Sequence, residues 1–188
     1  TRVARSADAT TTNTQLLATL SSTRPVRLLG LIRNNLSLAA RYRLTLYSDA
    51  AATVTVYAGA WTDVWPLSYP LGSVAYEDPH FWGQRYLAED VAGYPWNLIV
   101  WLDQPYYARA IKLEIDDTAN ADGFVQAGLL EVAQGWQFSV NFPFGSRLGW
   151  EMRTEPERAD GGVEYANRVA KPRRFTGETQ YLPEAEML

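Results

Sequence analysis

The side chains with the clearest capacity for chemistry lie in one segment, EIDDTANADG, at residues 114–123. Carboxylate and amide oxygens at this spacing can bind calcium, act as catalytic acids, or stabilise a turn by accepting backbone N–H groups. An EF-hand loop aligned on Gly123 would begin at Thr118 and would have Leu129 where a bidentate glutamate is required. We therefore favour a turn between two strands, in which Gly123 adopts a positive φ and three side chains bond locally: Asp117, Asn120 and Asp122.

Few other residues offer catalytic chemistry. The chain contains one histidine, His80, and no cysteine, which nearly excludes histidine relays and thiolate nucleophiles. His80 is expected to make hydrogen bonds within its loop. Ser146 directly follows Gly145, so this segment does not match the Gly-x-Ser-x-Gly nucleophile motif. Adjacent acidic residues are interpreted as solvated turn residues, although the carboxylate pair of a glycosidase has no fixed spacing in sequence. The sequence thus predicts a protein without catalytic residues, cofactor or bound metal.

Composition restricts the class of protein further. Of the 188 residues, 47% are hydrophobic and 20% are charged, as in an ordinary soluble globular domain. No apolar run approaches the roughly 18 residues that a membrane-spanning helix needs. The segment TRVARSADATTTNTQ lacks the apolar stretch of a signal peptide. The net charge of -4 argues against nucleic acid as the main partner. We therefore expect no membrane span, no export and no nucleic-acid binding.

The elements expected to position these loops are strands. In RYRLTLY, Leu44 and Leu46 alternate with other side chains at the period of a half-buried strand. Two continuous apolar runs, VRLLGLI and NLIVWL, predict strands that are buried on both faces. With one possible helical turn at AEDVAG, the pattern predicts a two-sheet β-sandwich over residues 1–150. The same alternation occurs in three further segments: TVTVY (53–57), RAIKLEID (109–116) and WQFSVNF (136–142).

A segment rich in aromatic residues and prolines interrupts this pattern between residues 57 and 97. Such a loop is either functional or packed by its own rings. Exposed rings with nearby polar groups would form a carbohydrate platform or a protein-binding surface, whereas buried rings would be architecture. We favour burial for most of these rings. Sugar binding and protein contact are the alternatives for five candidates: Trp61, Trp65, Trp82, Tyr86 and Trp96.

From residue 151 onward the apolar periodicity fades and the density of charge rises. The segment 151–188 predicts a hairpin around residues 160–162, then an extended arm, and the first turn of a helix at Pro183. We expect this arm to contact a neighbouring subunit, because it holds few core residues. Its basic run, RVAKPRRF, is either a solvated face or a contact with an acidic neighbour, with nucleic acid as a weaker alternative. The candidate assembly residues are Arg168, Arg173, Arg174 and Phe175.

Two segments resemble a known family. RPVRLLGLIRNNLSLAARYRLTLYSD contains an apolar strand that ends in an Asn-Leu-Ser step, at residues 35–37, before Ala40 opens the next strand. A later block passes through Asp-x-x-Asn-x-Asp-Gly, at residues 117–123, into a strand that contains Gly128. This pattern is similar to the discoidin-like (galactose-binding-like) jelly rolls of tail and baseplate proteins from long-tailed bacteriophages. EDPHFWGQRYLAEDVAGYPWNL resembles their inserted loop, and Asn34 stands where family members often have histidine.

The resemblance implies an all-β jelly-roll sandwich with a long aromatic loop insertion and an extended C-terminal arm. It implies a non-enzymatic virion component of the phage tail tip or baseplate, made in the host cytoplasm and assembled with other tail proteins. Such components form symmetric homo-oligomers, here a trimer or hexamer around the tail axis. The alternative function is a carbohydrate-binding module that contacts the host cell envelope, and a tail-associated glycosidase is a more distant one. No active site follows from the resemblance.

Overall fold

The computed structural model describes residues 3–92, 97–137, 139–142, 144–152, 156–158, 161, 164–166, 172–178 and 183–184. Internal contacts divide the chain into two units, Thr1–Gly135 and Trp136–Leu188. The boundary predicted from the sequence lies later in the chain, after residue 150. The described elements are mostly strands that pair antiparallel, which confirms the all-β class.

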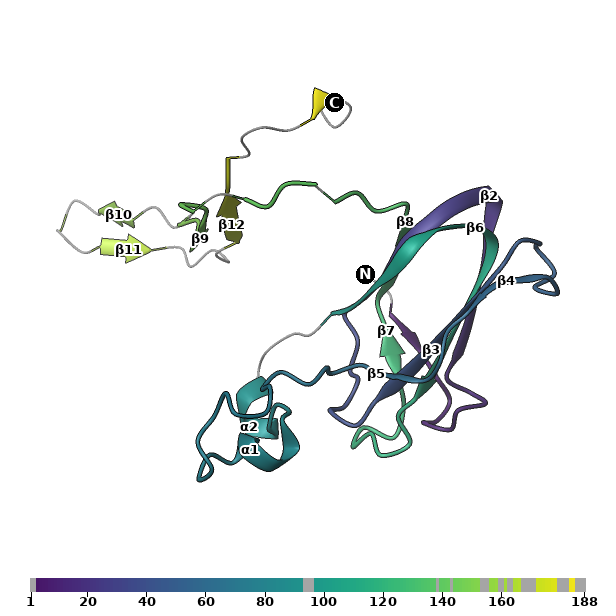
Figure 1. The fold of residues 1–188 in the computed structure, drawn as a ribbon. Coiled ribbons are helices and arrows are strands. Elements are labelled where there is room, and N and C mark those ends of the chain that lie inside the picture. The colour runs from purple at the N-terminus through teal and green to yellow at the C-terminus, as the bar shows by residue number, and fades with distance from the viewer. Residues whose placement is uncertain are drawn as a thin grey trace. The chain divides into compact units, whose positions relative to one another are not determined.

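Two long antiparallel strands form the frame of the first unit, β2 (Gln15–Ile32) and β6 (Leu98–Asp116). The first part of β2 pairs with the end of β6, and the second part of β2 pairs with the start of β6. Between these two stretches the register shifts, and both strands bend (Figure 1). They arch from one layer to the other, so one continuous sheet supplies both layers of the unit.

Shorter strands complete the two layers. β3 (Arg41–Tyr47) pairs with the end of β6 and, on its other edge, with β4 (Thr55–Ala58) and β5 (Thr62–Asp63). In the opposite layer, β8 (Leu129–Ala133) pairs with the end of β2. The resulting order is β4-β3-β6-β2-β8, and it places both long strands in the middle of the sheet.

The core fills the space between the layers, because apolar side chains alternate inward on the facing strands. On β3 and β6 the buried residues are those that the alternation predicted: Leu44, Leu46, Ile111, Leu113 and Ile115. The strand predicted at NLIVWL forms the start of β6, but the prediction that both of its faces are buried was wrong. Leu98 and Val100 face the core, but Ile99 and Trp101 are exposed, because the start of β6 lies in a layer whose outer face meets solvent.

The strand predicted at WQFSVNF was also wrong. Its described residues lie outside any strand, and Phe138 is outside the described part of the chain. An alternating pattern forms a strand only where neighbouring strands bury one of its faces. Val140 and Phe142 remain exposed here.

RYRLTLY and TVTVY form a hairpin, since β3 and β4 pair directly. Val54 is nevertheless exposed and lies before β4. The carboxylate of Asp49 accepts hydrogen bonds from the N–H groups of Thr53 and Val54, at 3.0 and 2.8 Å. These bonds close the turn and place Val54 in the turn instead of on the core face.

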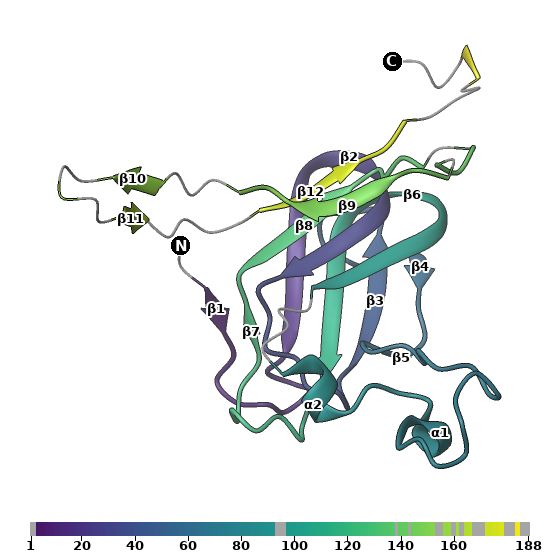
Figure 2. The ribbon, with the colours of Figure 1, turned by 90° about the vertical axis from the view of Figure 1, so that its left-hand side faces the viewer.

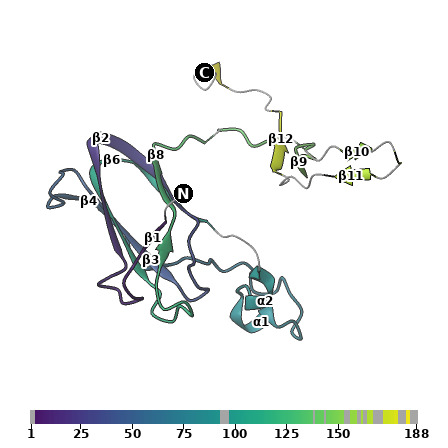
Figure 3. The same ribbon diagram turned by 180° about the vertical axis from the view of Figure 1, so that it is seen from behind.

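Residues 64–92 form an insertion after β5 that contains two single-turn helices, α1 (His80–Gly83) and α2 (Ala88–Val91) (Figure 3). The second helix is the turn predicted at AEDVAG. An ion pair of 2.6 Å between Arg85 and Asp63 ties the insertion to β5. None of the helices in the described ranges is long and apolar enough to cross a membrane.

Two small sheets remain. In the first unit, β1 (Ala4–Arg5) pairs with β7 (Gln126–Ala127). The second unit contains two two-stranded ribbons. In one, β9 (Arg147–Trp150) pairs with β12 (Arg173–Thr176), and in the other, β10 (Pro156–Arg158) pairs with β11 (Glu164–Ala166). Figure 2 shows β9 and β12 side by side. β10 and β11 pair on either side of residues 160–162, where the sequence predicts a hairpin.

Candidate interaction surfaces

Side-chain hydrogen bonds hold the loop that follows β6. Asp117 is 2% exposed, and its carboxylate accepts hydrogen bonds from the N–H and hydroxyl groups of Ser37 and from the amide of Asn120. The same Asn120 amide donates to the Asn35 carbonyl at 2.9 Å, and its side-chain oxygen accepts the N–H of Asp122. The buried carboxylate of Asp117 therefore already has hydrogen-bond donors within the protein.

Asn35 joins the two loops at this end of the unit. Its Nδ2 donates to Asp122 Oδ2 at 2.8 Å and to the Phe124 carbonyl at 3.0 Å, while its Oδ1 accepts the Gln126 N–H at 2.7 Å. Gly123 has a φ of 73°, which is the conformation that the turn interpretation requires. Across the described ranges, no group of three His, Asp or Glu side chains is arranged so that it could hold a metal ion. The geometry of this region is that of a turn.

The aromatic candidates do not form one common surface. Trp65 is only 5% exposed, and its ring packs edge-on against Tyr86, with the ring centroids 5.9 Å apart. Tyr86 in turn packs against Tyr69 at 5.8 Å. Since these rings pack on one another and on the core cluster, Trp65 is not available to a ligand, and Tyr86 is partly covered.

Two further candidates differ from this packed group. Trp61 is half-buried on the sandwich, where the guanidinium of Arg43 lies 4.9 Å from its ring centroid. Arg43 is itself held by Glu114 through a bond of 2.8 Å between Nε and Oε2. The Trp61 ring therefore packs over the ion pair that Arg43 on β3 and Glu114 on β6 form. Trp96 lies outside the described residues.

Trp82 belongs to an exposed aromatic cluster, which we define as Tyr76, Phe81 and Trp82. Its three rings contact one another edge to face, with centroids 5.2 to 5.5 Å apart. Tyr76 is 65% exposed and Trp82 is 75% exposed. Sequence reasoning selected Trp82 but missed its two neighbours, although all three lie within the YEDPHFW segment. The cluster presents aromatic faces and edges to solvent on the insertion.

His80 lies between two carboxylates in the same insertion. Its Nδ1 is 2.6 Å from Asp78 Oδ1, its Nε2 is 2.7 Å from Asp90 Oδ2, and the Tyr69 ring lies 4.4 Å from the imidazole. The hydrogen bonds to Asp90 and Asp78 raise the pKa of His80 above its ordinary value. The bond from His80 likewise lowers the pKa of Asp90. His80 therefore makes loop hydrogen bonds, as its sequence context predicted.

The second unit exposes a series of large apolar side chains. We call this set the apolar ribbon; it consists of Phe144, Leu148, Trp150, Met152 and Phe175. Leu148 pairs with Phe175 across β9 and β12. Of the basic residues predicted to act in assembly, Arg173 and Arg174 lie in β12, and Arg168 is outside the described residues. Sequence reasoning identified Phe175 but not the residues of β9.

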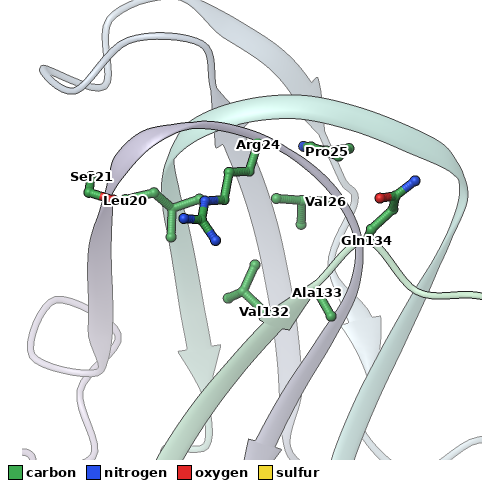
Figure 4. Close-up of a pocket in the computed structure, with 8 residues that line it drawn as sticks. All are labelled: Leu20, Ser21, Arg24, Pro25, Val26, Val132, Ala133 and Gln134. Atoms are coloured by element: carbon green, nitrogen blue, oxygen red, sulfur yellow. The ribbon is translucent and has the colours of Figure 1, made fainter.

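A pocket lies where β2 bends, and the end of β8 lines its other side (Figure 4). Its volume is about 400 Å³. Figure 4 shows the side chain of Arg24 extending into the space that Leu20 and Val132 also line. None of these residues was selected from the sequence, because they meet only through the long-range pairing of β2 with β8.

The described geometry thus provides two exposed apolar surfaces, the aromatic cluster and the apolar ribbon, together with one mixed polar and apolar pocket. The cluster at His80 lacks a nucleophile in hydrogen-bond contact with the imidazole, among the contacts described for it. Comparison with family models, with curated proteins and with solved structures finds no match to this chain.

Proposed function

We propose that this protein is a non-enzymatic structural component of a bacteriophage tail tip or baseplate, and that it assembles with neighbouring subunits through its second unit. The observation that supports an assembly role is the exposure of the apolar ribbon, whose residues lie on or next to β9 and β12. A two-stranded ribbon is at best marginally stable by itself in water. Contiguous exposed apolar side chains are typical of protein interfaces. The proposed sandwich is the galactose-binding-like jelly roll that the sequence resembles.

The proposed neighbour is a second copy of this chain within a ring around the tail axis. The charged residues on the two strands are basic, namely Arg147, Arg173 and Arg174, and the acidic residues Glu151 and Glu178 follow the strands in sequence. In a ring of three or six copies the contacts run head to tail, so the ribbon would pack on a different surface of the neighbouring copy. Burial of Leu148 and Phe175 would contribute about 1.5–3 kcal/mol each to association.

Light scattering after size exclusion tests this proposal on the full chain. Replacing Leu148 and Phe175 together with serine should convert an oligomer to monomer while circular dichroism stays unchanged. Leu17→Ser is the matched control, because Leu17 is an exposed leucine of β2 in the first unit. A wild-type chain that remains monomeric at all concentrations would contradict self-association. A mass-spectrometric inventory of purified particles that lacks this chain would contradict the virion assignment.

A second candidate function is binding of a host-surface glycan. It is supported by the exposure of Tyr76 and Trp82, since sugar rings stack on such surfaces. On a glycan array, Trp82→Ala should lose any signal of the wild type, whereas Trp61→Ala should keep it, because Trp61 covers an ion pair on the sandwich. Equal signals from both variants would exclude the aromatic cluster as the binding surface.

A further inference from the structure

The pocket at the bend of β2 has its origin in an irregular pairing. Thr19 pairs with Ala110 and Arg24 pairs with Ala108, so residues 20–23 of β2 lie opposite the single residue Arg109. The additional residues on one strand form a bulge, and a bulge bends the strand that contains it. The bulge lies apart from β8, which pairs with β2 only from Leu28 onward. The pocket of about 400 Å³ opens between them.

One part of the pocket lining is aliphatic. Leu20, Pro25 and Val26 contribute from β2, and Val132 and Ala133 contribute from β8 (Figure 4). Val26 is buried, and Val132 packs on the core cluster, so this part of the lining rests on the core of the unit. A firm aliphatic wall favours a ligand with an apolar body.

The other part of the lining supplies hydrogen-bond donors. They are the hydroxyl of Ser21, the guanidinium of Arg24 and the amide of Gln134. The guanidinium is a planar fork whose geometry matches a carboxylate in a two-bond contact. A carboxylate group therefore fits next to the guanidinium of Arg24.

Arg24 has no carboxylate partner of its own among the residues that the structure describes. The neighbouring Arg27 differs in this respect. Its guanidinium donates to the carbonyls of Leu102 and Asp103, at 3.1 and 3.2 Å, and lies over the ring of Trp101. Arg27 is thus fixed to β6, whereas the guanidinium of Arg24 extends into the pocket (Figure 4).

We propose that this pocket binds a small aliphatic carboxylate. Arg24 holds the carboxylate through two parallel hydrogen bonds. The alkyl part of the ligand lies against Leu20 and Val132. This inference is independent of the assembly role, because it concerns residues of the first unit alone.

Calorimetric titration of the full chain with octanoate tests the inference. Octanoate should bind the wild type, and octanol, which lacks the charge, should bind at least tenfold more weakly. Arg24→Gln should weaken octanoate binding at least tenfold, and Arg24→Lys should recover part of the loss because it keeps the charge without the fork. Arg109→Gln is the matched control and should bind as the wild type does. Arg109 is exposed between the buried Ala108 and Ala110, so it points to the other face of β6.

A second pair of probes distinguishes a free fatty acid from the carboxyl end of a peptide. N-acetyl-leucine carries the peptide-type carboxylate, and N-acetyl-leucinamide is its neutral counterpart. Tighter binding of octanoate would identify a free fatty acid as the ligand, and tighter binding of N-acetyl-leucine would identify the carboxyl end of a peptide. In either case Arg24→Gln must reduce the binding of that acid. The inference is overturned if neither acid binds the wild type, if each neutral counterpart binds equally well, or if Arg24→Gln and Arg109→Gln behave alike. Circular dichroism of each variant verifies the fold.

Discussion

The Nε2 atom of His80 lies 2.7 Å from a carboxylate oxygen of Asp90, and this contact joins α1 to α2 within the insertion. The same carboxylate accepts the N–H of Leu87 at 2.7 Å, at the start of α2. The other ring nitrogen of His80 is in hydrogen-bond contact with the carboxylate of Asp78. Only the doubly protonated imidazolium can donate to both carboxylates at once.

We predict that the insertion loosens as the pH rises. The bonds to Asp90 and Asp78 raise the pKa of His80 above 6.5. The stability that these bonds give the insertion is therefore fully present below pH 6.5, and it is lost as the pH rises through the folded-state pKa of His80. The pKa values of Asp78 and Asp90 are lowered from 3.8, so their contribution is present above pH 3.8 and is lost as the pH falls through their folded-state pKa values. Hydrogen exchange of the amides in α1 and α2 should therefore be slowest between pH 3.8 and 6.5 after correction for intrinsic rates.

The control for this prediction is His80→Gln, which should remove the pH dependence above pH 6.5. Tyr69 faces the imidazole, but burial raises its pKa above 10, so it stays protonated through this range. A nuclear magnetic resonance titration of the single histidine gives the folded-state pKa directly. An apparent pKa at or below 6.5 would contradict the proposed contact.

Gly123→Val should destabilise the protein by about 1 kcal/mol or more. The φ of 73° at this position is strained for any residue with a Cβ and most strained for a β-branched one. Space is not the cause, because a Cβ at Gly123 would meet no atom within 4 Å. Gly123→Asn is the matched variant and should lose less, since asparagine tolerates this conformation. If urea denaturation gave the same loss of unfolding free energy for Gly123→Val and Gly123→Asn, the positive φ would not be the cause of the destabilisation.

Millimolar calcium should leave the melting temperature of the wild type unchanged. The carboxylate of Asp117 is already engaged by Ser37 and Asn120, and Asp122 is engaged by Asn35. A ligand that bound this loop in the folded state would raise the melting temperature by mass action. A rise that depends on calcium concentration would revive the cation-loop hypothesis.

Asn35→Ala should destabilise the first unit by about 1–3 kcal/mol, because it leaves the Gln126 N–H and the Phe124 carbonyl without the partners that Asn35 supplies. Asn13→Ala is the matched control. Asn13 is exposed and donates to Asp8 at the surface, so its loss should stay within about 0.5 kcal/mol. Urea denaturation of both variants measures the difference.

Trp65→Ala should cost about 3–5 kcal/mol of unfolding free energy, as is typical for a buried ring. Trp82→Ala should change stability by less than about 0.5 kcal/mol, because the indole is mostly exposed. Thermal or urea denaturation measures both. A large loss at Trp82 would mean that the aromatic cluster holds the insertion together and is not free for a partner.

Local alternation was sufficient to predict β3, β4 and the end of β6. Leu44 and Leu46, like Ile111 and Leu113, lie on the core face because side chains point to opposite faces of any strand at a period of two. The positive φ of Gly123 was equally local, since it depends on the residue itself, but the carboxylates of Asp117 and Asp122 bond to Ser37 and Asn35 in a loop distant in sequence.

Tertiary structure alone decided which apolar residues are covered. Trp65 and Trp82 lie in one sequence segment of similar composition, yet one is buried and the other exposed. The exposure of the two rings differs because different residues pack against them. Trp65 packs against Tyr86 on the core side, whereas Trp82 packs against Tyr76 near solvent. Burial is a property of neighbours distant in sequence, and a local pattern does not contain it.

The pocket shows the same limit for a candidate site. The sequence by itself determined β3 and the end of β6, the apolar faces of these two strands, and the turn that follows β6. It did not determine that residues 20–23 of β2 face a single residue of β6, or that Arg24 therefore shares a pocket with Val132. Register between strands is set by the free energy of the whole sheet, summed over many pairs, and so it is decided only when the long strands come together.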